Sequence, residues 1–250
     1  MSNDTVIRIR SLRKRYNGSH EEALKGVDLD ITEGEFFGLL GPNAAGKSTL
    51  ISTLCGIIAP SSGEVELFGQ PMNRHSVRLK SQIGLIPQEI ALYPSLTVVE
   101  NILYFGRLHG LSGMALKERV NSCISLFNLE EHRDKLISKC SGGIKRRVNL
   151  IAGVIHEPRL ILLDEPTLGV DPQLRSMIFD FLAGLNRQGA TLIYTTHYME
   201  EAETLCNRVS IIDHGSILNQ GSPAELIASQ PGCNNLGELF LNLTGRRLRD

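Results

Sequence analysis

The sequence is poor in cysteine, and its five cysteines (Cys55, Cys123, Cys140, Cys206 and Cys233) are widely separated and form no CxxC pair. An odd, scattered set of this kind argues against a disulfide framework and against a zinc site. It favours a reducing compartment, in which most of these residues serve as small buried apolar side chains.

Net charge and long apolar runs are also missing. Lys and Arg number 26 against 27 Asp and Glu, so no bulk electrostatic field points to nucleic acid or to an anionic membrane. No apolar run is long enough to span a membrane, and the N-terminus MSNDTVIRIR lacks the apolar segment of a signal peptide. With 42% apolar and 21% charged residues, the chain of 250 residues is expected to be a soluble globular protein of the cytoplasm.

Short apolar runs alternate with helix-period segments along most of the chain, which predicts an α/β fold with a largely parallel sheet. Compact runs such as LILLD, TLIYTT and VSIID are typical of strands that are buried on both faces. Near the start of the chain, VIRIR and VDLDI instead alternate apolar and polar residues, as half-buried strands do.

The stretch 89–157 has a different character, because its segments have helical spacing and none of them is a convincing strand. We therefore expect a single domain over residues 1–250. Within it, 1–88 and 158–225 would form the α/β core, 89–157 an inserted helical subdomain, and 226–250 a C-terminal helical extension.

The segment GPNAAGKST matches the phosphate-binding pattern G-x-x-x-x-G-K-[ST] and lies between an expected strand, FFGLLG, and an expected helix. In this pattern the backbone N–H groups surround the phosphates, Lys47 reaches the β- and γ-phosphate oxygens, and the Ser48 hydroxyl ligates Mg²⁺. The predicted nucleotide-binding residues of the loop are Gly41, Pro42, Asn43, Ala44, Ala45, Gly46, Lys47, Ser48 and Thr49.

Two adjacent carboxylates, Asp164 and Glu165, end the apolar run LILLDE. An apolar run that ends in this way is weak evidence alone, but it becomes strong beside a phosphate-binding loop. Asp164 is expected to hold Mg²⁺ through water, and Glu165 to polarise the attacking water.

A second possible anion site begins the helix-period segment CSGGIKRRVNL. Ser141, Gly142 and Gly143 stand directly before the helical pattern, so N–H groups are free of side-chain obstruction at the positive end of the helix dipole. The chain therefore carries two candidate phosphate sites, nearly a hundred residues apart.

Taken in order, these motifs resemble those of the ATP-binding-cassette (ABC) ATPases from residue 5 to about residue 225. GPNAAGKST is similar to the family's P-loop, SGG to its signature, and LLDEPTLGVD to its Walker B strand and D-loop. Gln88 is similar to the Q-loop glutamine, His197 to the switch histidine, and Tyr16 to the aromatic residue that the family places against adenine. The resemblance implies an α/β fold: a P-loop NTPase (RecA-like) core with an N-terminal antiparallel β portion and an inserted all-helical subdomain.

The resemblance also implies ATP and Mg²⁺ as ligands and ATP hydrolysis as the activity. Gln88 would contact Mg²⁺ and water rather than be a plain surface residue, and His197 would bond the γ-phosphate rather than be structural. Tyr16 would stack on adenine, although an exposed tyrosine in a polar loop is common. Asp171 would shape the loop that crosses to a partner, although Asp before Pro is also ordinary turn chemistry.

In this family two nucleotide-binding domains pair head to tail, and each ATP lies between the P-loop of one and the signature of the other. The second phosphate site, Ser141 to Gly143, would therefore serve the partner's nucleotide. The partner would be a second copy of this chain or a paralogous cassette.

The sequence departs from the family pattern at three positions. Ala44 replaces the usual third glycine of the P-loop, which costs about 1 kcal/mol or more if its φ is positive. Cys140 replaces a usual leucine, and Ile144 a usual polar or Met residue. None of these changes removes a catalytic or charged group.

The length fits a stand-alone cassette that works with separate polytopic membrane subunits, and IALYPSLTVVENILYFGRLHGL resembles the same segment of ABC-2-type exporter ATPases. Its aromatics, Tyr93, Tyr104 and Phe105, either form a groove for a coupling helix of the membrane subunit or pack in the core. Such a permease would hold the chain on the inner face of the cell membrane. The alternative is a soluble ABC ATPase of an assembly or regulatory complex. The resemblance also implies that the membrane subunit selects the exported substrate, so this sequence does not identify it.

Overall fold

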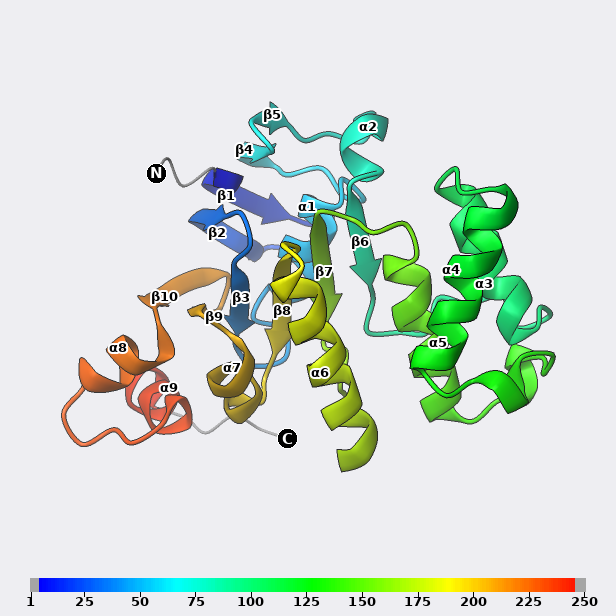
Figure 1. Cartoon of the computed structure of the whole chain (residues 1–250). Coiled ribbons are helices and arrows are strands. Elements are labelled where there is room, and N and C mark those ends of the chain that lie inside the picture. Colours follow the sequence, from blue (N-terminus) through cyan, green and yellow to red (C-terminus); the bar gives the residue numbers. More distant parts are fainter. Residues whose placement is uncertain (1–4, 246–250) are drawn as a thin grey trace.

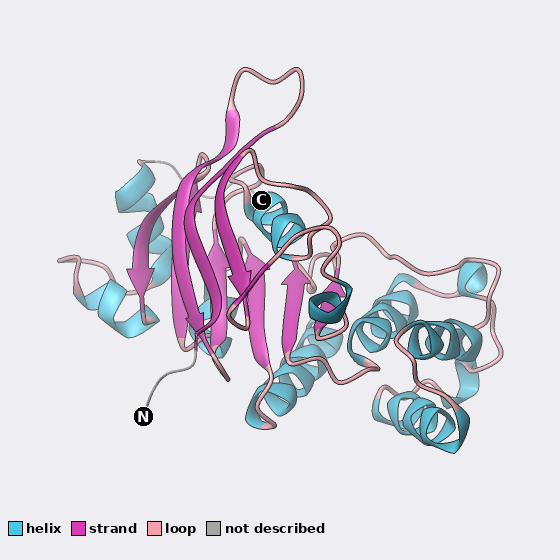
Figure 2. Cartoon of the chain, turned by 90° about the horizontal axis from the view of Figure 1, so that it is seen from above, coloured by secondary structure: helices cyan, strands magenta, loops and turns pink. Residues whose placement is uncertain are grey.

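The computed structural model describes residues 5–245. Two β-sheets and several layers of helix make up the fold, with the helices of the middle third of the chain set to one side (Figure 1). Seen from above, the strands are gathered together and a group of helices projects to one side of them (Figure 2). The α/β fold with an antiparallel N-terminal portion and a helical subdomain is thereby confirmed.

The first sheet is antiparallel and has the strand order β2-β1-β4-β5. Alternation of buried and exposed residues along β1 matches the half-buried pattern expected of VIRIR. The four strands are β1 (Thr5–Arg15), β2 (Glu22–Thr32), β4 (Ser62–Leu67) and β5 (Gln70–Pro71).

The second sheet has the order β10-β9-β3-β8-β7-β6, and all of its pairs are parallel except β10 with β9. Because its parallel strands run side by side, their carboxyl ends meet at one edge of the sheet. The strands are β3 (Phe36–Leu40), β6 (Ile83–Ile86), β7 (Leu160–Asp164), β8 (Thr191–Thr196), β9 (Arg208–Asp213) and β10 (Ser216–Gly221).

Three groups of helices surround the sheets (Figure 1). Those beside the sheets are α1 (Lys47–Leu54), α2 (Val77–Lys80), α6 (Pro172–Arg187) and α7 (Met199–Leu205). The helical subdomain contains α3 (Val98–Leu108), α4 (Gly113–Leu126), α5 (Gly142–Val154) and the 3₁₀ turns Glu130–His132 and Ile137–Lys139. The last helices are α8 (Pro223–Ala228) and α9 (Leu236–Thr244).

Strand β3 shows why the strands of the second sheet have continuous apolar sequences. All five of its residues are buried, because one face packs against the first sheet and the other against helices. Phe37 and Leu39 belong to the core shared with the first sheet, whereas Phe36 and Leu40 belong to the core that extends into the helical subdomain. The helical subdomain is therefore packed onto the sheet through a common apolar core.

Sequence cues account for several helix ends. Thr97 and Glu100 form a reciprocal capping box at the start of α3, and Ser222 and Glu225 do the same for α8. Strand β10 was not expected from the sequence; its residues SILNQG continue a hairpin from β9. Residue 226, where a C-terminal extension was expected to begin, lies within α8.

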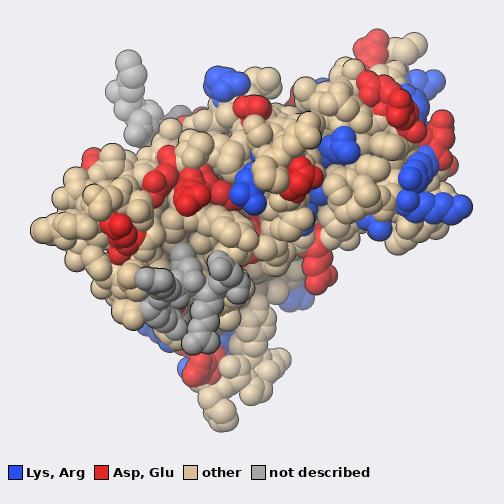
Figure 3. Space-filling model, turned by 90° about the horizontal axis from the view of Figure 1, so that it is seen from below, with Lys and Arg blue, Asp and Glu red and all other residues tan. Residues whose placement is uncertain are grey.

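The cysteines are unpaired, as expected, and Cys55, Cys140 and Cys206 are buried. Burial raises the pKa of the Cys55 thiol to about 12, which keeps it a neutral apolar side chain. On the face seen from below, acidic and basic side chains are interspersed and most of the surface is uncharged (Figure 3). Within residues 5–245, no helix is both long and apolar enough to cross a membrane.

Candidate nucleotide site

The loop between β3 and α1 is shaped by glycines that no other residue could replace without movement. A Cβ atom at Gly41 would lie 2.2 Å from the Ile212 carbonyl oxygen, and one at Gly46 would lie 2.6 Å from that of Ala23. Gly46 also has φ 111 and serves as the N-cap of α1 without any capping side chain. No acidic residue lies in the first turn of α1, so the positive end of this helix faces the loop unopposed by acid from its own first turn.

Ala44 adopts the left-handed conformation, with φ 65. The sequence left the sign of this angle open, and the structure gives the strained case. An L-residue pays about 1–2 kcal/mol in this region, so the loop carries stored strain at this position.

Lys47, the first residue of α1, is buried, with a relative exposure of 5%. Its Nζ donates to the carbonyl oxygen of Gly41 at 2.7 Å and to that of Pro42 at 3.1 Å. It also lies 3.0 Å from Glu165 Oε1. A buried cation thus sits within the loop, held by two carbonyls and one carboxylate.

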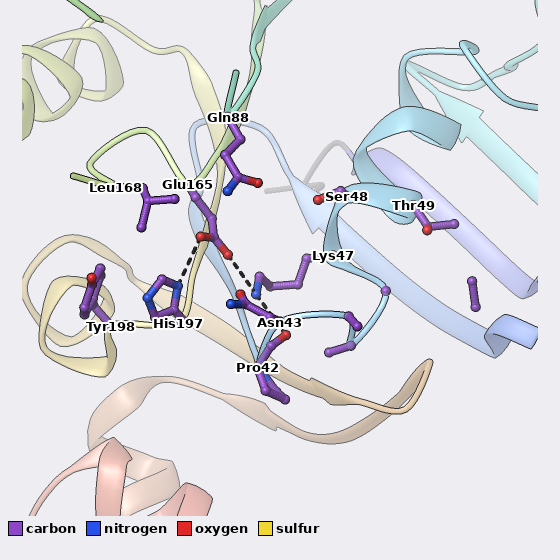
Figure 4. Close-up of a pocket in the computed structure, with 14 residues that line it drawn as sticks. Pro42, Asn43, Lys47, Ser48, Thr49, Gln88, Glu165, Leu168, His197 and Tyr198 are labelled. Atoms are coloured by element: carbon purple, nitrogen blue, oxygen red, sulfur yellow. Dashed lines mark hydrogen bonds and ion pairs between the residues drawn. The ribbon is translucent and has the colours of Figure 1, made fainter. Parts of the chain in front are cut away.

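Glu165 follows directly after β7 and His197 directly after β8, so neighbouring parallel strands deliver both to the same edge of the sheet. Glu165 Oε2 lies 3.1 Å from His197 Nδ1, and both side chains are buried. The Glu165 backbone has φ 47 and is held by its N–H, which donates to the carbonyl and hydroxyl oxygens of Thr195. Lys47, Glu165 and His197 therefore form a continuous row of contacts (Figure 4).

This row lines a hollow of about 490 Å³ at the carboxyl edge of the sheet. Gln88 enters it from the segment after β6, and its side chain points toward Glu165 (Figure 4). The lining residues are Ala23, Pro42, Asn43, Ala44, Ala45, Gly46, Lys47, Ser48, Thr49, Gln88, Glu165, Leu168, His197 and Tyr198.

Three lining residues were missed by the sequence analysis: Ala23, Leu168 and Tyr198. Leu168 and Tyr198 lie close in sequence to Glu165 and His197, and this proximity could have identified them as lining residues. Ala23 comes from β2, and nothing in its own sequence context marks it.

Asp164 and Tyr16 are expected site residues that do not line the hollow. Asp164 is buried and accepts a hydrogen bond from the Thr195 hydroxyl at 2.7 Å. Tyr16 is 46% exposed, and its hydroxyl lies 3.2 Å from the hydroxyl of Thr49, a lining residue. Lys14 Nζ lies 5.4 Å from the centre of the Tyr16 ring.

The expected residues Ser141, Gly142, Gly143 and Asp171 do not line this hollow either. Ser141 is the exposed N-cap of α5, and its Oγ accepts from the N–H of Ile144 at 3.5 Å. Around Gly142 there is open space, since an added Cβ would meet nothing within 4 Å. Asp171 caps α6 by accepting from the N–H of Leu174 at 2.9 Å, which is turn chemistry of the kind considered for it.

The two departures near SGG are explained by packing. Cys140 and Ile144 are both buried in the core that joins the helical subdomain to the sheet. Apolar residues at these positions therefore support the start of α5 from beneath and leave its exposed face unchanged.

The hollow fits a phosphate chain on three counts: a buried cation, glycines whose Cβ atoms would collide, and a helix start without a capping side chain. The Ser48 hydroxyl and the Gln88 carboxamide line the same hollow as Glu165. In residues 5–245, no three His, Cys, Asp or Glu side chains converge to form a complete metal cage. That is compatible with Mg²⁺, which often takes one or two protein oxygens and completes its shell with phosphate and water.

Comparison with known proteins agrees with this geometry. The profile of the ABC transporter family matches residues 24–168. The chain is 40% identical over 240 residues to the linearmycin resistance ATP-binding protein of Bacillus subtilis, which covers 96% of this chain and 75% of that protein. It is also 40% identical over 229 residues to a Nod factor export ATP-binding protein of Cupriavidus metallidurans, across 92% of this chain and 75% of that one.

A solved dimeric structure of an ATP-binding cassette with bound ADP and Pi superimposes with a TM-score of 0.79 and 28% identity, covering 86% of this chain and 98% of that one. The resemblance inferred from the ordered motifs is confirmed. The chain belongs to the ABC transporter family and is an ATPase of that family.

Proposed function

We propose that the chain is the ATP-hydrolysing subunit of an ABC-2-type exporter, in which two cassettes enclose ATP and drive separate membrane subunits. The observation that carries the hydrolytic part is the row formed by Lys47, Glu165 and His197 at the edge of the phosphate-binding loop. The names of the relatives, one a Nod factor export protein and one a linearmycin resistance protein, support export over soluble assembly work.

In the proposed site, the loop N–H groups and Lys47 bind the phosphates of ATP. Ser48, Asp164 and Gln88 supply oxygens for Mg²⁺, which when bound would neutralise charge on the β- and γ-phosphates. Glu165 is the base that activates water, and His197 donates a hydrogen bond to the γ-phosphate. Tyr16, beside Thr49, takes the adenine ring.

The contact between Lys47 and Glu165 has a consequence for the binding step. In this structure, one carboxylate oxygen of Glu165 is paired with the Lys47 ammonium group. Phosphate oxygens compete for the same ammonium group, so binding of ATP would release this carboxylate oxygen for water. The base is therefore freed when the substrate arrives.

For the second phosphate site, we propose that the SGG start of α5 binds the γ-phosphate of ATP held by a partner cassette. Ser141 and Gly142 are exposed and stand apart from their own chain's hollow, which supports a role toward another molecule. Asp171, which orients the start of α6, would help to shape the loop that faces the partner. The dimeric cassette among the solved structures is consistent with such a pair.

For the membrane subunits, we propose a docking surface that includes Tyr93 and Tyr104. These rings are 44% and 38% exposed, pack edge to face with centres 4.7 Å apart, and share a hydrogen bond of 3.0 Å between their hydroxyls. Phe105 differs, since it is half-buried against the core. Docking there would hold the cassette at the inner face of the membrane.

The experiment that tests the proposal is co-purification of the tagged chain from its native cell, followed by ATPase measurement. The proposal expects a polytopic membrane protein to accompany the wild-type chain and to be lost on Tyr104→Asp. Ser125→Asp, an exposed change on α4, serves as the control. Recovery of only soluble assembly factors would reject the exporter reading in favour of the soluble alternative.

A further inference from the structure

One of the buried carboxylates, that of Glu201, is not used by the proposed chemistry. Glu201, in the first turn of α7, has a relative exposure of 4%. Its neighbour on the same helix, Glu200, is exposed. Burying an ionised carboxylate is costly unless hydrogen bonds and opposite charge compensate it, so its partners are informative.

Three hydroxyl groups converge on Glu201. Tyr194 donates to Oε2 at 2.7 Å, and Thr196 donates to the same oxygen at 2.9 Å. Thr167 donates to the carboxylate with contacts of 2.9 Å to Oε1 and 3.0 Å to Oε2. Burial and the nearby Glu201 charge raise the pKa of the Tyr194 phenol, so this group remains protonated and able to donate.

Arg175 of α6 adds the opposite charge. Its Nε lies 3.6 Å from Glu201 Oε1, and its guanidinium carbon lies 5.7 Å from the centre of the Tyr198 ring. One carboxylate therefore joins β8, α6, α7 and the segment that follows β7. The Arg175 guanidinium compensates the buried charge of Glu201. It also connects this network to Tyr198, which lines the nucleotide hollow.

Two of these hydroxyls belong to the turns that carry the catalytic side chains. Thr196 precedes His197, and its Oγ accepts a hydrogen bond from the N–H of Tyr198 at 2.9 Å. Because the same hydroxyl donates to Glu201, the backbone on both sides of His197 is linked to this carboxylate. Thr167 lies two residues after Glu165, whose backbone is itself in the left-handed region. The same carboxylate is thus bonded to both turns.

We propose that Glu201 is a positioning residue that fixes the separation of Glu165 and His197 by holding the turn that carries each of them. This inference rests on the proposed roles of those two residues in ATP hydrolysis. Glu201 touches neither reacting group, so its action is geometric. An ionised carboxylate accepts the three hydroxyls together, whereas an amide has one acceptor oxygen and leaves its N–H groups facing hydroxyls that must turn round.

The test compares Glu201→Gln with Glu200→Gln, a matched change one residue earlier on the exposed side of α7. Glu201→Gln should bind ATP with wild-type affinity and show kcat reduced about 10- to 100-fold, since a small displacement of catalytic groups costs this much. Glu200→Gln should keep the wild-type kcat. An unchanged kcat in Glu201→Gln, or ATP binding lost in proportion to kcat, would overturn the proposal.

Thr167→Val provides a second variant that keeps the side-chain volume and removes a single hydroxyl. It should lower kcat in the same direction without changing ATP affinity. Suppose that Thr167→Val folds normally and retains the full kcat, while Glu201→Gln is unfolded. The Glu201 carboxylate would then serve only to stabilise the fold, and the inference would fail.

A measurement that does not depend on catalysis tests this inference separately from the proposed function. In ¹⁵N-labelled protein, the ring resonances of His197, assigned with His197→Gln, should shift in Glu201→Gln and stay in place in Glu200→Gln. Unshifted His197 resonances would overturn the positioning role. A wild-type chain that fails to hydrolyse ATP, with shifted resonances in Glu201→Gln, would reject the proposed function and leave the positioning role standing.

Discussion

Two helix starts in this chain have the features of anion sites, and they are built differently. The start of α1 lies in a hollow where Lys47 contacts Glu165 and Glu165 contacts His197. The start of α5 is capped by exposed Ser141, with open space around Gly142. Neither helix has an acidic residue in its first turn. The first helix start lies among buried charged side chains of its own chain, whereas the second is exposed and does not line that hollow, as expected if it binds a phosphate held by another chain.

In the proposed dimer, this difference explains why one nucleotide-binding chain would carry two phosphate sites. At α1 the protein supplies the Lys47 cation, the proposed base Glu165 and His197, and all three side chains are buried. At α5 it supplies only a hydroxyl, N–H groups and the end of a helix dipole, which alone bind an anion weakly. In the proposed dimer, the second site would bind a γ-phosphate that is already held at the α1 of the other chain.

The largest expected effect is on the α1 side. Lys47→Ala should weaken ATP binding at least about 100-fold, because it removes charge-assisted contacts to two phosphates, each of about 1.5–3 kcal/mol. Isothermal titration with the purified chain measures it. Lys25→Ala, an exposed change on β2, is the control. Wild-type affinity in Lys47→Ala would contradict the assignment of the loop.

Glu165→Gln should separate binding from chemistry at the same site. Hydrolysis should fall about 10²- to 10⁴-fold through loss of the general base, while ATP stays bound and a nucleotide-bound dimer accumulates. Gel filtration with ATP and Mg²⁺ measures the dimer, with exposed Glu64→Gln as the control. If the variant hydrolyses ATP at the wild-type rate, another residue is the base.

On the α5 side, Ser141→Arg should leave ATP affinity of the monomer within about twofold of wild type. Hydrolysis should nevertheless fall at least about 100-fold, because a bulky cation displaces N–H donors from the partner's γ-phosphate. A titration and an ATPase assay on one preparation measure both. Ser125→Arg, on the exposed side of α4, should change neither.

The smallest expected effect concerns strain, which the structure places in the phosphate loop. Ala44→Gly should raise the free energy of unfolding by up to about 1 kcal/mol, since relief of the positive φ exceeds the added entropy of the unfolded chain. The adjacent Ala45→Gly should lower it, because Ala45 is buried and has no positive φ. Chemical denaturation measures both, and equal destabilisation by the two changes would contradict this account.

Much of the α1 site was predictable from sequence, because a short loop between a strand and a helix carries its own geometry in its residues. Gly41, Gly46 and Lys47 fall where the motif requires them. Glu165 and His197 were expected at the ends of two apolar runs, and the structure shows that these runs are neighbouring parallel strands, which brings the two ends together.

The rest depends on contacts between distant segments. Nothing in MEEAE distinguishes Glu201 from Glu200, since only the helix phase set by packing decides which one is buried. The conformation of Ala44 and the approach of Ala23 from β2 are likewise set by neighbouring backbone. The hairpin strand β10 was not predicted, because its polar residues give little alternation of apolar and polar side chains.

The most direct test of the two-site account mixes Ser141→Arg chains with Lys47→Ala chains, each inactive alone. In a head-to-tail heterodimer one composite site carries both lesions and the other carries neither. An equal mixture with random pairing should therefore recover about a quarter of the wild-type ATPase rate. No recovery at any mixing ratio, together with ATP affinity in Ser141→Arg as poor as in Lys47→Ala, would show that α5 serves its own chain's nucleotide and would contradict the account.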